Sequence, residues 1–178
     1  GVSPLTCVGS RVVFEDGRIG VIGVDQKREN ASKVPKLEEL YLDVGATSRE
    51  DCPVEVGDPA VFERPFVAQG TRLVSKAMDD RVSCAVLIEV LRRLTETPHD
   101  LHVVFAVQEE VGLRGARPSA YGIDPEIAIA VDVTRTGDTP ESKPMAVNLG
   151  DGPAVKVKDS GMIAHPRVRQ SLVDRAEE

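Results

Sequence analysis

The sequence predicts an α/β protein in which a small all-β module precedes a mainly parallel sheet flanked by helices. In the first part of the chain, short β-branched runs alternate with turn residues, which is typical of an all-β module with a barrel-like closure. After Gly70, nearly continuous apolar runs alternate with helical patterns, which is typical of a parallel sheet covered on both faces. We therefore expect two domains, a β-barrel domain at residues 1–69 and a partial α/β domain at residues 70–178.

Composition places the chain among globular proteins. Of its 178 residues, 41% are hydrophobic and 29% are charged, and 22 basic against 29 acidic residues give a formal charge of -7. Because the sequence has no basic run and only 3% aromatic residues, nucleic acid is not an expected partner. No apolar stretch is long enough to cross a membrane. The three cysteines are widely spaced, so we expect a cytoplasmic protein without a disulfide framework or Cys-ligated zinc.

In the first domain, apolar β-branched runs predict strands at 11–14, 19–24, 40–44 and 59–62. Asp16 and Gly17 between the first two runs predict a hairpin turn. Residues 25–39 are polar and predict an exposed loop, whereas the hydroxyls and acids of 47–51 predict one helical turn.

In the second domain, strands are expected at 72–78, 102–107, 127–133, 145–149 and 154–158, and helices at 79–95, 113–121 and from Pro166 onward. The last helix begins with proline at a first-turn position but has no glycine, asparagine or proline to end it. The chain also begins with Gly1 in a loop-like stretch. We therefore expect a chain that is truncated at both ends.

Acidic residues follow three of the predicted parallel strands. Asp79 and Asp80 end the first, Glu109 and Glu110 end the second, and Asp132 ends the third. Ligands of open parallel sheets bind beyond the carboxyl ends of the strands. Carboxylates that converge there must share protons or bind cations, because like charges raise one another's pKa. The sequence therefore predicts a divalent metal site, with a spare carboxylate that takes a proton from metal-bound water.

Each acid alone also has a simpler explanation. Asp79 or Asp80 suits a helix N-cap, and the two glutamates suit a solvated strand end. Asp132 is harder to explain this way, since a carboxylate in an apolar strand is costly unless it is paired or bound to a metal. The three histidines are poorly placed as metal ligands: His99 and His102 begin their strand, and His165 precedes the last helix.

Several segments together resemble the glutamyl aminopeptidase family, which includes the tetrahedral aminopeptidases and members labelled cellulase M or endoglucanase. The segments cover the chain in the family's order: LYLDVGA at 40–46, VGDP at 56–59, KAMDDR at 76–81, VQEEVGLRGA at 107–116, DVT at 132–134, DTP at 138–140 and GDGP at 150–153. The QEEVGLRG string within 107–116 is the most specific of them.

The resemblance implies a dinuclear metallo-aminopeptidase with a zinc-peptidase-like α/β catalytic domain and an inserted β-barrel domain, assembled as a homo-oligomer that is a dodecamer in the family. It implies two divalent metal ions, zinc or cobalt, with manganese or magnesium as alternatives, and peptide substrates. By the same resemblance, the site residues are Asp79 as the carboxylate that bridges both metals, Glu110 and Asp132 as ligands of one metal each, Glu109 as the general base, Asp80 as the support of Asp79, and Arg81 as the partner of nearby acids.

The chain departs from the family pattern in one respect. In the family each metal also takes one histidine, and neither of the segments that carry them is found here. We therefore expect weakened zinc or cobalt binding and little or no activity from these 178 residues alone. Two alternatives stay open: a non-catalytic homologue or assembly module, and an endoglucanase. Two adjacent glutamates on one strand point to opposite faces, which suits a ligand beside a base better than two groups flanking one sugar bond.

Overall fold

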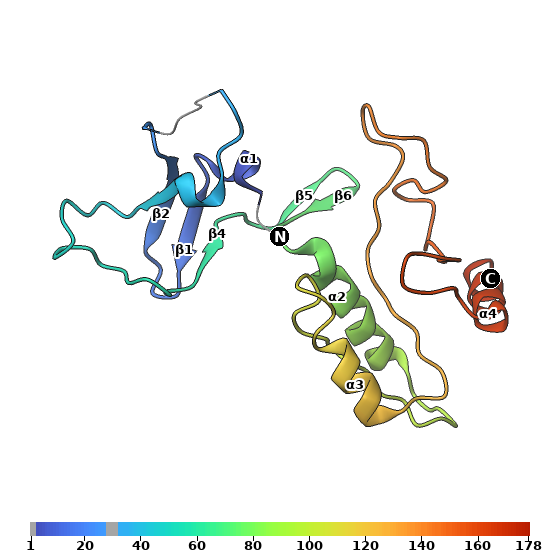
Figure 1. The fold of residues 1–178 in the computed structure, drawn as a ribbon. Coiled ribbons are helices and arrows are strands. Elements are labelled where there is room, and N and C mark those ends of the chain that lie inside the picture. Colours follow the sequence, from blue (N-terminus) through green and yellow to red (C-terminus); the bar gives the residue numbers. More distant parts are fainter. Residues whose placement is uncertain (1–2, 28–31) are drawn as a thin grey trace. The chain divides into compact units, whose positions relative to one another are not determined.

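The computed structural model describes residues 3–27 and 32–178, and the chain divides into two compact units, residues 1–128 and 129–178. It is a mixed α/β protein, as Figure 1 shows from the blue N-terminal strands to the red C-terminal helix, and its sheets are antiparallel. The predicted domain boundary at residue 70 is a different division of the chain and stays a prediction. Residues 28–31 of the predicted loop lie outside the described residues.

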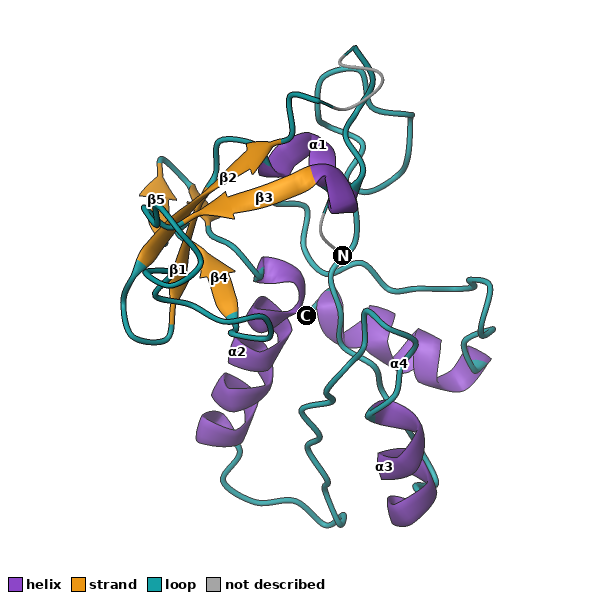
Figure 2. Cartoon of the chain, turned by 60° about the vertical axis from the view of Figure 1, so that its left-hand side comes forward, coloured by secondary structure: helices purple, strands orange, loops and turns teal. Residues whose placement is uncertain are grey.

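Four short strands of the first unit form one open sheet, drawn in orange in Figure 2. They are β1 (Arg11–Phe14), β2 (Ile19–Val24), β3 (Leu40–Asp43) and β4 (Ala60–Phe62), in the order β3-β2-β1-β4. The predicted hairpin is confirmed: Gly17 adopts a φ of 86°, which suits glycine, and the Phe14 N–H donates to the Arg18 carbonyl at 2.9 Å. Because β3 and β4 are the two ends of the sheet, these strands do not close the predicted barrel.

The buried core of the first unit lies against this sheet. The helix α1 (Pro4–Cys7) contributes Cys7, which is 1% exposed, and β1 contributes Val12 and Phe14, each 7% exposed. Val12 and Phe14 are two residues apart and therefore lie on the same face of the strand. Their opposite neighbours belong to β4, where Val12 pairs with Phe62 and Phe14 pairs with Ala60.

We expect Phe14→Ala to lower the free energy of unfolding of the full-length protein by about 3–5 kcal/mol, because it removes a buried ring and leaves a cavity. Phe66→Ala is the matched control, since Phe66 is 61% exposed. Urea unfolding followed by circular dichroism measures both variants. Equal losses in the two variants would show that the β1 face is not the core of this unit.

The segment 47–51 forms bends in place of the predicted helical turn. The Asp51 carboxylate accepts the Thr47 hydroxyl at 2.6 Å, the Ser48 N–H at 2.7 Å and the Thr47 N–H at 3.1 Å. Such local bonds between a side chain and the backbone compete with helix formation, which explains the difference. The Thr47 hydroxyl, followed by the two N–H groups, lowers the pKa of Asp51 from 3.8 to about 2.

This lowered pKa predicts how the turn depends on pH. Since the folded pKa of Asp51 lies below its unfolded value of 3.8, the stabilisation is complete above pH 4 and is lost as the pH falls through about 2. Carbon-13 NMR of the Asp51 carboxyl in the full-length protein should give a titration midpoint near 2, and Thr47→Val should move it upward. A midpoint near 3.8 in the unaltered protein would contradict the bonded turn.

A second hairpin joins the sheet region to the first long helix. It consists of β5 (Val67–Gln69) and β6 (Arg72–Val74), which pair antiparallel around Gly70, whose φ is 61°. The predicted strand at 72–78 thus ends at Val74. The strand at 67–69 was not predicted, because a run of three residues carries too little alternation to be recognised.

The three predicted helices of the second part of the chain are confirmed with small shifts of their ends. They are α2 (Met78–Arg93), α3 (Ala116–Ile123) and α4 (Pro166–Ala176). A short 3-10 helix, η1 (Leu37–Glu39), precedes β3. In α2 the first regular helical residue follows Asp80, since Asp79 and Asp80 have non-helical backbone angles. Among the described residues, no helix is both long and apolar enough to cross a membrane.

The predicted parallel sheet is not formed by the described residues. The segments 102–107, 127–133, 145–149 and 154–158 are drawn as loops in Figure 2, apart from one isolated bridge between Lys158 and Ile163. A strand exists only where a second strand takes up its N–H and C=O groups, and these segments have no such partner in the described parts of the chain. Their apolar side chains are accordingly exposed, as at Val107, which is 67% exposed.

Candidate metal centre

Asp79 and Asp80 lie where the chain enters α2. The peptide bond between them is cis. Asp79 adopts φ -84° and ψ 106° and Asp80 adopts φ -120° and ψ 39°, so the regular helix begins only after this pair. The Arg81 N–H donates to the Ala77 carbonyl at 3.1 Å and closes the first turn. Each aspartate offers a carboxylate oxygen within 4.8 Å of the other, which is close enough for both to bind one ion.

Asp80 has the carboxylate oxygen whose surroundings best fit a cation. Its side chain is half-buried, and Oδ1 is buried without a hydrogen-bond partner among the described residues. A buried carboxylate oxygen without a partner costs free energy unless a cation or a donor reaches it. The residues at the start of α2 therefore fit a divalent cation. Because they supply only oxygen, they suit a hard ion such as Mg²⁺ or Mn²⁺ better than they suit zinc.

Glu109 and Glu110 lie on a short closed loop between 107 and 115. The N–H groups of Gly112 and Leu113 both donate to the Glu109 carbonyl at 3.0 Å, and the Arg114 N–H donates to the Gln108 carbonyl at 3.2 Å. Both glutamate side chains are exposed. Neither of them joins Asp79 and Asp80 in a group whose oxygens all lie within 4.8 Å of one another. The segment 102–107 that leads into the loop has no strand partner to hold it, which is a physical reason for this separation.

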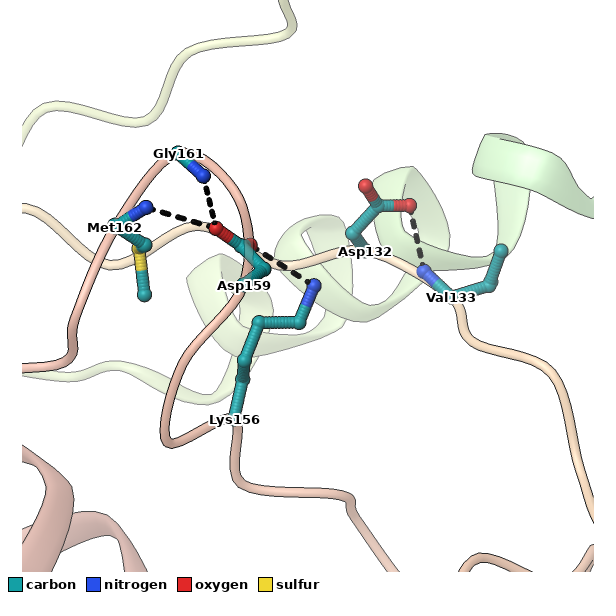
Figure 3. Close-up of polar contacts among 6 residues, drawn as sticks. All are labelled: Asp132, Val133, Lys156, Asp159, Gly161 and Met162. Carbon is teal, nitrogen blue, oxygen red and sulfur yellow. Dashed lines mark hydrogen bonds and ion pairs between the residues drawn. The ribbon is translucent and has the colours of Figure 1, made fainter. Parts of the chain in front are cut away.

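Asp132 belongs to the second unit, where its Oδ1 accepts the N–H of Val133 at 2.7 Å (Figure 3). This bond leaves the second carboxylate oxygen facing away from the backbone. The loop that follows is closed by the Gly137 N–H, which donates to the Val147 carbonyl at 2.7 Å. Asp138 Oδ2 accepts the Leu149 N–H at 3.4 Å, so this carboxylate helps to hold the loop.

A second carboxylate of this unit, Asp159, is bound by the chain itself. Figure 3 shows its oxygens accepting the N–H groups of Gly161 and Met162, at 2.7 and 2.8 Å, and the ammonium of Lys156 at 3.3 Å. The two backbone bonds, and then Lys156, lower the pKa of Asp159. Asp159 thus stabilises a turn, in contrast to Asp80, whose buried oxygen has no such donor.

The poor placement of the three histidines as metal ligands stays a prediction. His99, His102 and His165 are exposed, and none of them belongs to a metal-sized group of ligands within the described residues. Sequence reasoning did not find the unpartnered Asp80 oxygen or the close approach of Val107 to Gly115 at the two ends of the 107–115 loop. Both depend on atoms that pack in space, for which residue spacing carries no signal.

The whole chain matches a known family of peptidases. The match to the M42 glutamyl aminopeptidase family covers residues 1–178. A relative from Acetivibrio thermocellus is 48% identical over 99% of this chain, and the lysyl aminopeptidase of Pyrococcus furiosus is 36% identical over 96%. These matches cover 54% and 52% of the two relatives, so the chain spans about half the length of the curated relatives it matches.

Solved structures agree with the family match. An aminopeptidase from Desulfurococcus kamchatkensis is 45% identical with a TM-score of 0.89, and the match covers 99% of this chain and 53% of that one. A TET1 peptidase of Pyrococcus horikoshii, which can assemble into a tetrahedron or a large octahedral shell, is 31% identical with a TM-score of 0.78, and the match covers 99% of this chain and 56% of that one.

One solved relative has a different name. The Thermotoga maritima protein called an endoglucanase is 32% identical with a TM-score of 0.80, over 99% of this chain and 54% of that one. Its name is the one observation in favour of the glycosidase alternative, whereas the family match and the named relatives describe aminopeptidases. The order of the motifs along the chain, the carboxylates at the start of α2 and the match over all 178 residues lead to one conclusion: the chain belongs to the M42 glutamyl aminopeptidase family.

Proposed function

We propose that the full-length protein is a metal-dependent aminopeptidase that removes N-terminal residues from peptides. The single observation that carries this proposal is the pair Asp79–Asp80 in a chain of the M42 family, with close carboxylates and a buried Asp80 oxygen that lacks a donor. The named relatives that are aminopeptidases support the reaction class. The chain covers about half of those relatives, so the activity belongs to the whole protein.

The resemblance assigns the ligands. Asp79, Glu110 and Asp132 would hold two divalent ions, with Asp79 shared between them and Glu110 and Asp132 each serving one. Asp80 supports Asp79, and Arg81 pairs with acids around the site. The ions supply Lewis-acid chemistry when bound, which polarises a carbonyl and makes bound water more acidic. Zinc or cobalt would bind more tightly with nitrogen ligands beside these carboxylates, whereas oxygen ligands alone suit manganese or magnesium.

Glu109 acts as the general base in this proposal. Its carboxylate is exposed on the 107–115 loop, so it is free to meet a water molecule and a substrate. It takes one proton from the attacking water and gives that proton to the amine that leaves. A substrate with a free N-terminus presents a positive charge, which the acidic residues near the metals attract, and this restricts cleavage to the end of a peptide.

The remaining features of the proposal concern the whole protein. In it, the segments 102–107 and 127–133 join a parallel sheet, and the β1–β4 sheet becomes part of a barrel. The assembly is a homo-oligomer, with a dodecamer as the expected form, since a TET1 relative of 31% identity is a dodecamer. The expected compartment is the cytoplasm.

A direct assay tests the proposal. The full-length protein, freed of metal with a chelator and then given Mn²⁺, Co²⁺ or Zn²⁺, should release a chromogenic amine from aminoacyl substrates only with metal present. The same samples should release no reducing sugar from a soluble glucan. Sugar release without amine release would establish the endoglucanase alternative. A metal-loaded sample inert in both assays would establish the non-catalytic homologue or assembly module.

A further inference from the structure

One pair of residues, Val107 and Gly115, closes the base of the loop that carries Glu109 and Glu110. The Gly115 N–H donates to the Val107 carbonyl at 2.9 Å. A Cβ added at Gly115 would lie 2.5 Å from the Val107 carbonyl oxygen and 2.6 Å from its nitrogen, whereas real Cβ atoms essentially never come within 3.0 Å of such atoms. The backbone of Val107 therefore occupies the space that any side chain at position 115 needs.

The backbone conformation does not explain this glycine. Gly115 has φ -78° and ψ -34°, angles that every L-residue adopts without strain. It is also the N-cap of α3, where serine, threonine, aspartate and asparagine are preferred because their side chains cap free N–H groups. The helix has no such cap here. Close approach of Val107 is thus the one physical reason in this structure for a residue without a side chain.

The hydrogen bond at Gly115 is the first of a series of backbone hydrogen bonds across the 107–115 loop. The Arg114 N–H donates to the Gln108 carbonyl, and the N–H groups of Gly112 and Leu113 donate to the Glu109 carbonyl. Gln108 and Leu113 have φ values of 56° and 59°, so the loop keeps an uncommon conformation while these bonds hold. Moving Gly115 away from Val107 would strain or break the other hydrogen bonds of the loop and would move both glutamates.

From this geometry we infer that Gly115 is a positioning residue for Glu109 and Glu110, acting by admitting the Val107 backbone at the base of their loop. The inference rests on the proposed function, which assigns these glutamates as base and metal ligand. Misplacement of a reacting group by about 1 Å can cost about 100-fold in rate, so a residue far from the reacting atoms can control it.

Three variants of the full-length protein test this role. Gly115→Ala adds the blocked Cβ, and Gly115→Ser adds the same atom together with a good N-cap hydroxyl. Gly122→Ala is the matched control, since a Cβ at Gly122 in α3 has no heavy atom within 4 Å. We expect both Gly115 variants to lose about 100-fold in kcat with little change in KM. Their affinity for Mn²⁺, measured by calorimetry, should fall about 10–100-fold, and Gly122→Ala should match the unaltered protein.

The outcomes separate this role from a structural one. If Gly115→Ser retains the kcat and the Mn²⁺ affinity, the position is a helix cap and the inference is wrong. Unchanged values in Gly115→Ala, or a loss equal to the unfolded fraction seen by circular dichroism, also overturn it. If the unaltered protein shows no metal-dependent amine release, the proposed function fails, and this inference with it. An active unaltered protein with unaffected Gly115 variants removes only the positioning role.

Discussion

Glu109→Gln in the full-length protein should lower kcat by about 10²–10⁴-fold with little change in KM. Glutamine keeps the size and shape of the side chain but cannot accept a proton, so the variant loses general-base catalysis and retains substrate binding. The Glu109 backbone is held by the loop bonds from Gly112 and Leu113, which the substitution does not touch. Steady-state kinetics with an aminoacyl chromogenic substrate at saturating Mn²⁺ measure the effect.

The control for Glu109 is Glu126→Gln. Glu126 is another exposed glutamate of the first unit and lies outside the candidate metal centre. The activity of the Glu126→Gln variant should therefore equal that of the unaltered protein. The metal content of both variants should be unchanged, because the proposal assigns Glu109 as the base and not as a ligand. A Glu109→Gln variant with full kcat, or one that loses its metal, would refute the base assignment.

Asp79→Asn should have a different signature, a loss of bound metal together with a loss of activity. The amide removes one negative charge and the ability to bridge two cations. We therefore expect activity to fall by more than about 100-fold, beyond the 10–100-fold typical of residues that only orient a ligand. Elemental analysis of the dialysed full-length protein measures the metal, and amine release measures the activity.

Two comparisons sharpen the Asp79 experiment. Asp80→Asn should lower the activity by about 10–100-fold, since in the proposal Asp80 supports Asp79 without bridging the ions. Asp100→Asn should have no effect, because Asp100 is exposed and is not one of the assigned ligands. Equal metal content in Asp79→Asn and Asp100→Asn would contradict the bridging role.

The local elements of the fold follow from the sequence because their causes are local. Asp16 and Gly17 predict the β1–β2 hairpin, since glycine adopts the positive φ of the turn and the aspartate carboxylate accepts the Arg18 N–H at 3.0 Å. The apolar periodicity before Arg93 predicts α2, and Pro166 predicts the start of α4. In each of these elements the bonds join residues close in the chain.

The predicted parallel strands could not be confirmed in the same way, because the hydrogen-bonding partners of a parallel strand are distant in the chain. The run 102–107 is as apolar as a buried strand, yet among the described residues no second strand takes up its N–H and C=O groups, so it remains a loop. The turn at 47–51 also could not be predicted from residue types. The same hydroxyls and acids that suit a helical turn form a different set of bonds around Asp51.

For the candidate metal centre, the sequence by itself predicted which residues carry the chemistry: the acidic pairs at 79–80 and 109–110, and Asp132, each within a motif that resembles the family. Residue types and their order along the chain are sufficient for that, because the family resemblance depends on nothing else. Only the tertiary structure decided that Asp80 buries an oxygen to which no described residue donates, and that Val107 lies where a side chain at Gly115 would be. Desolvation and close packing depend on distances between atoms, which the order of residues does not specify.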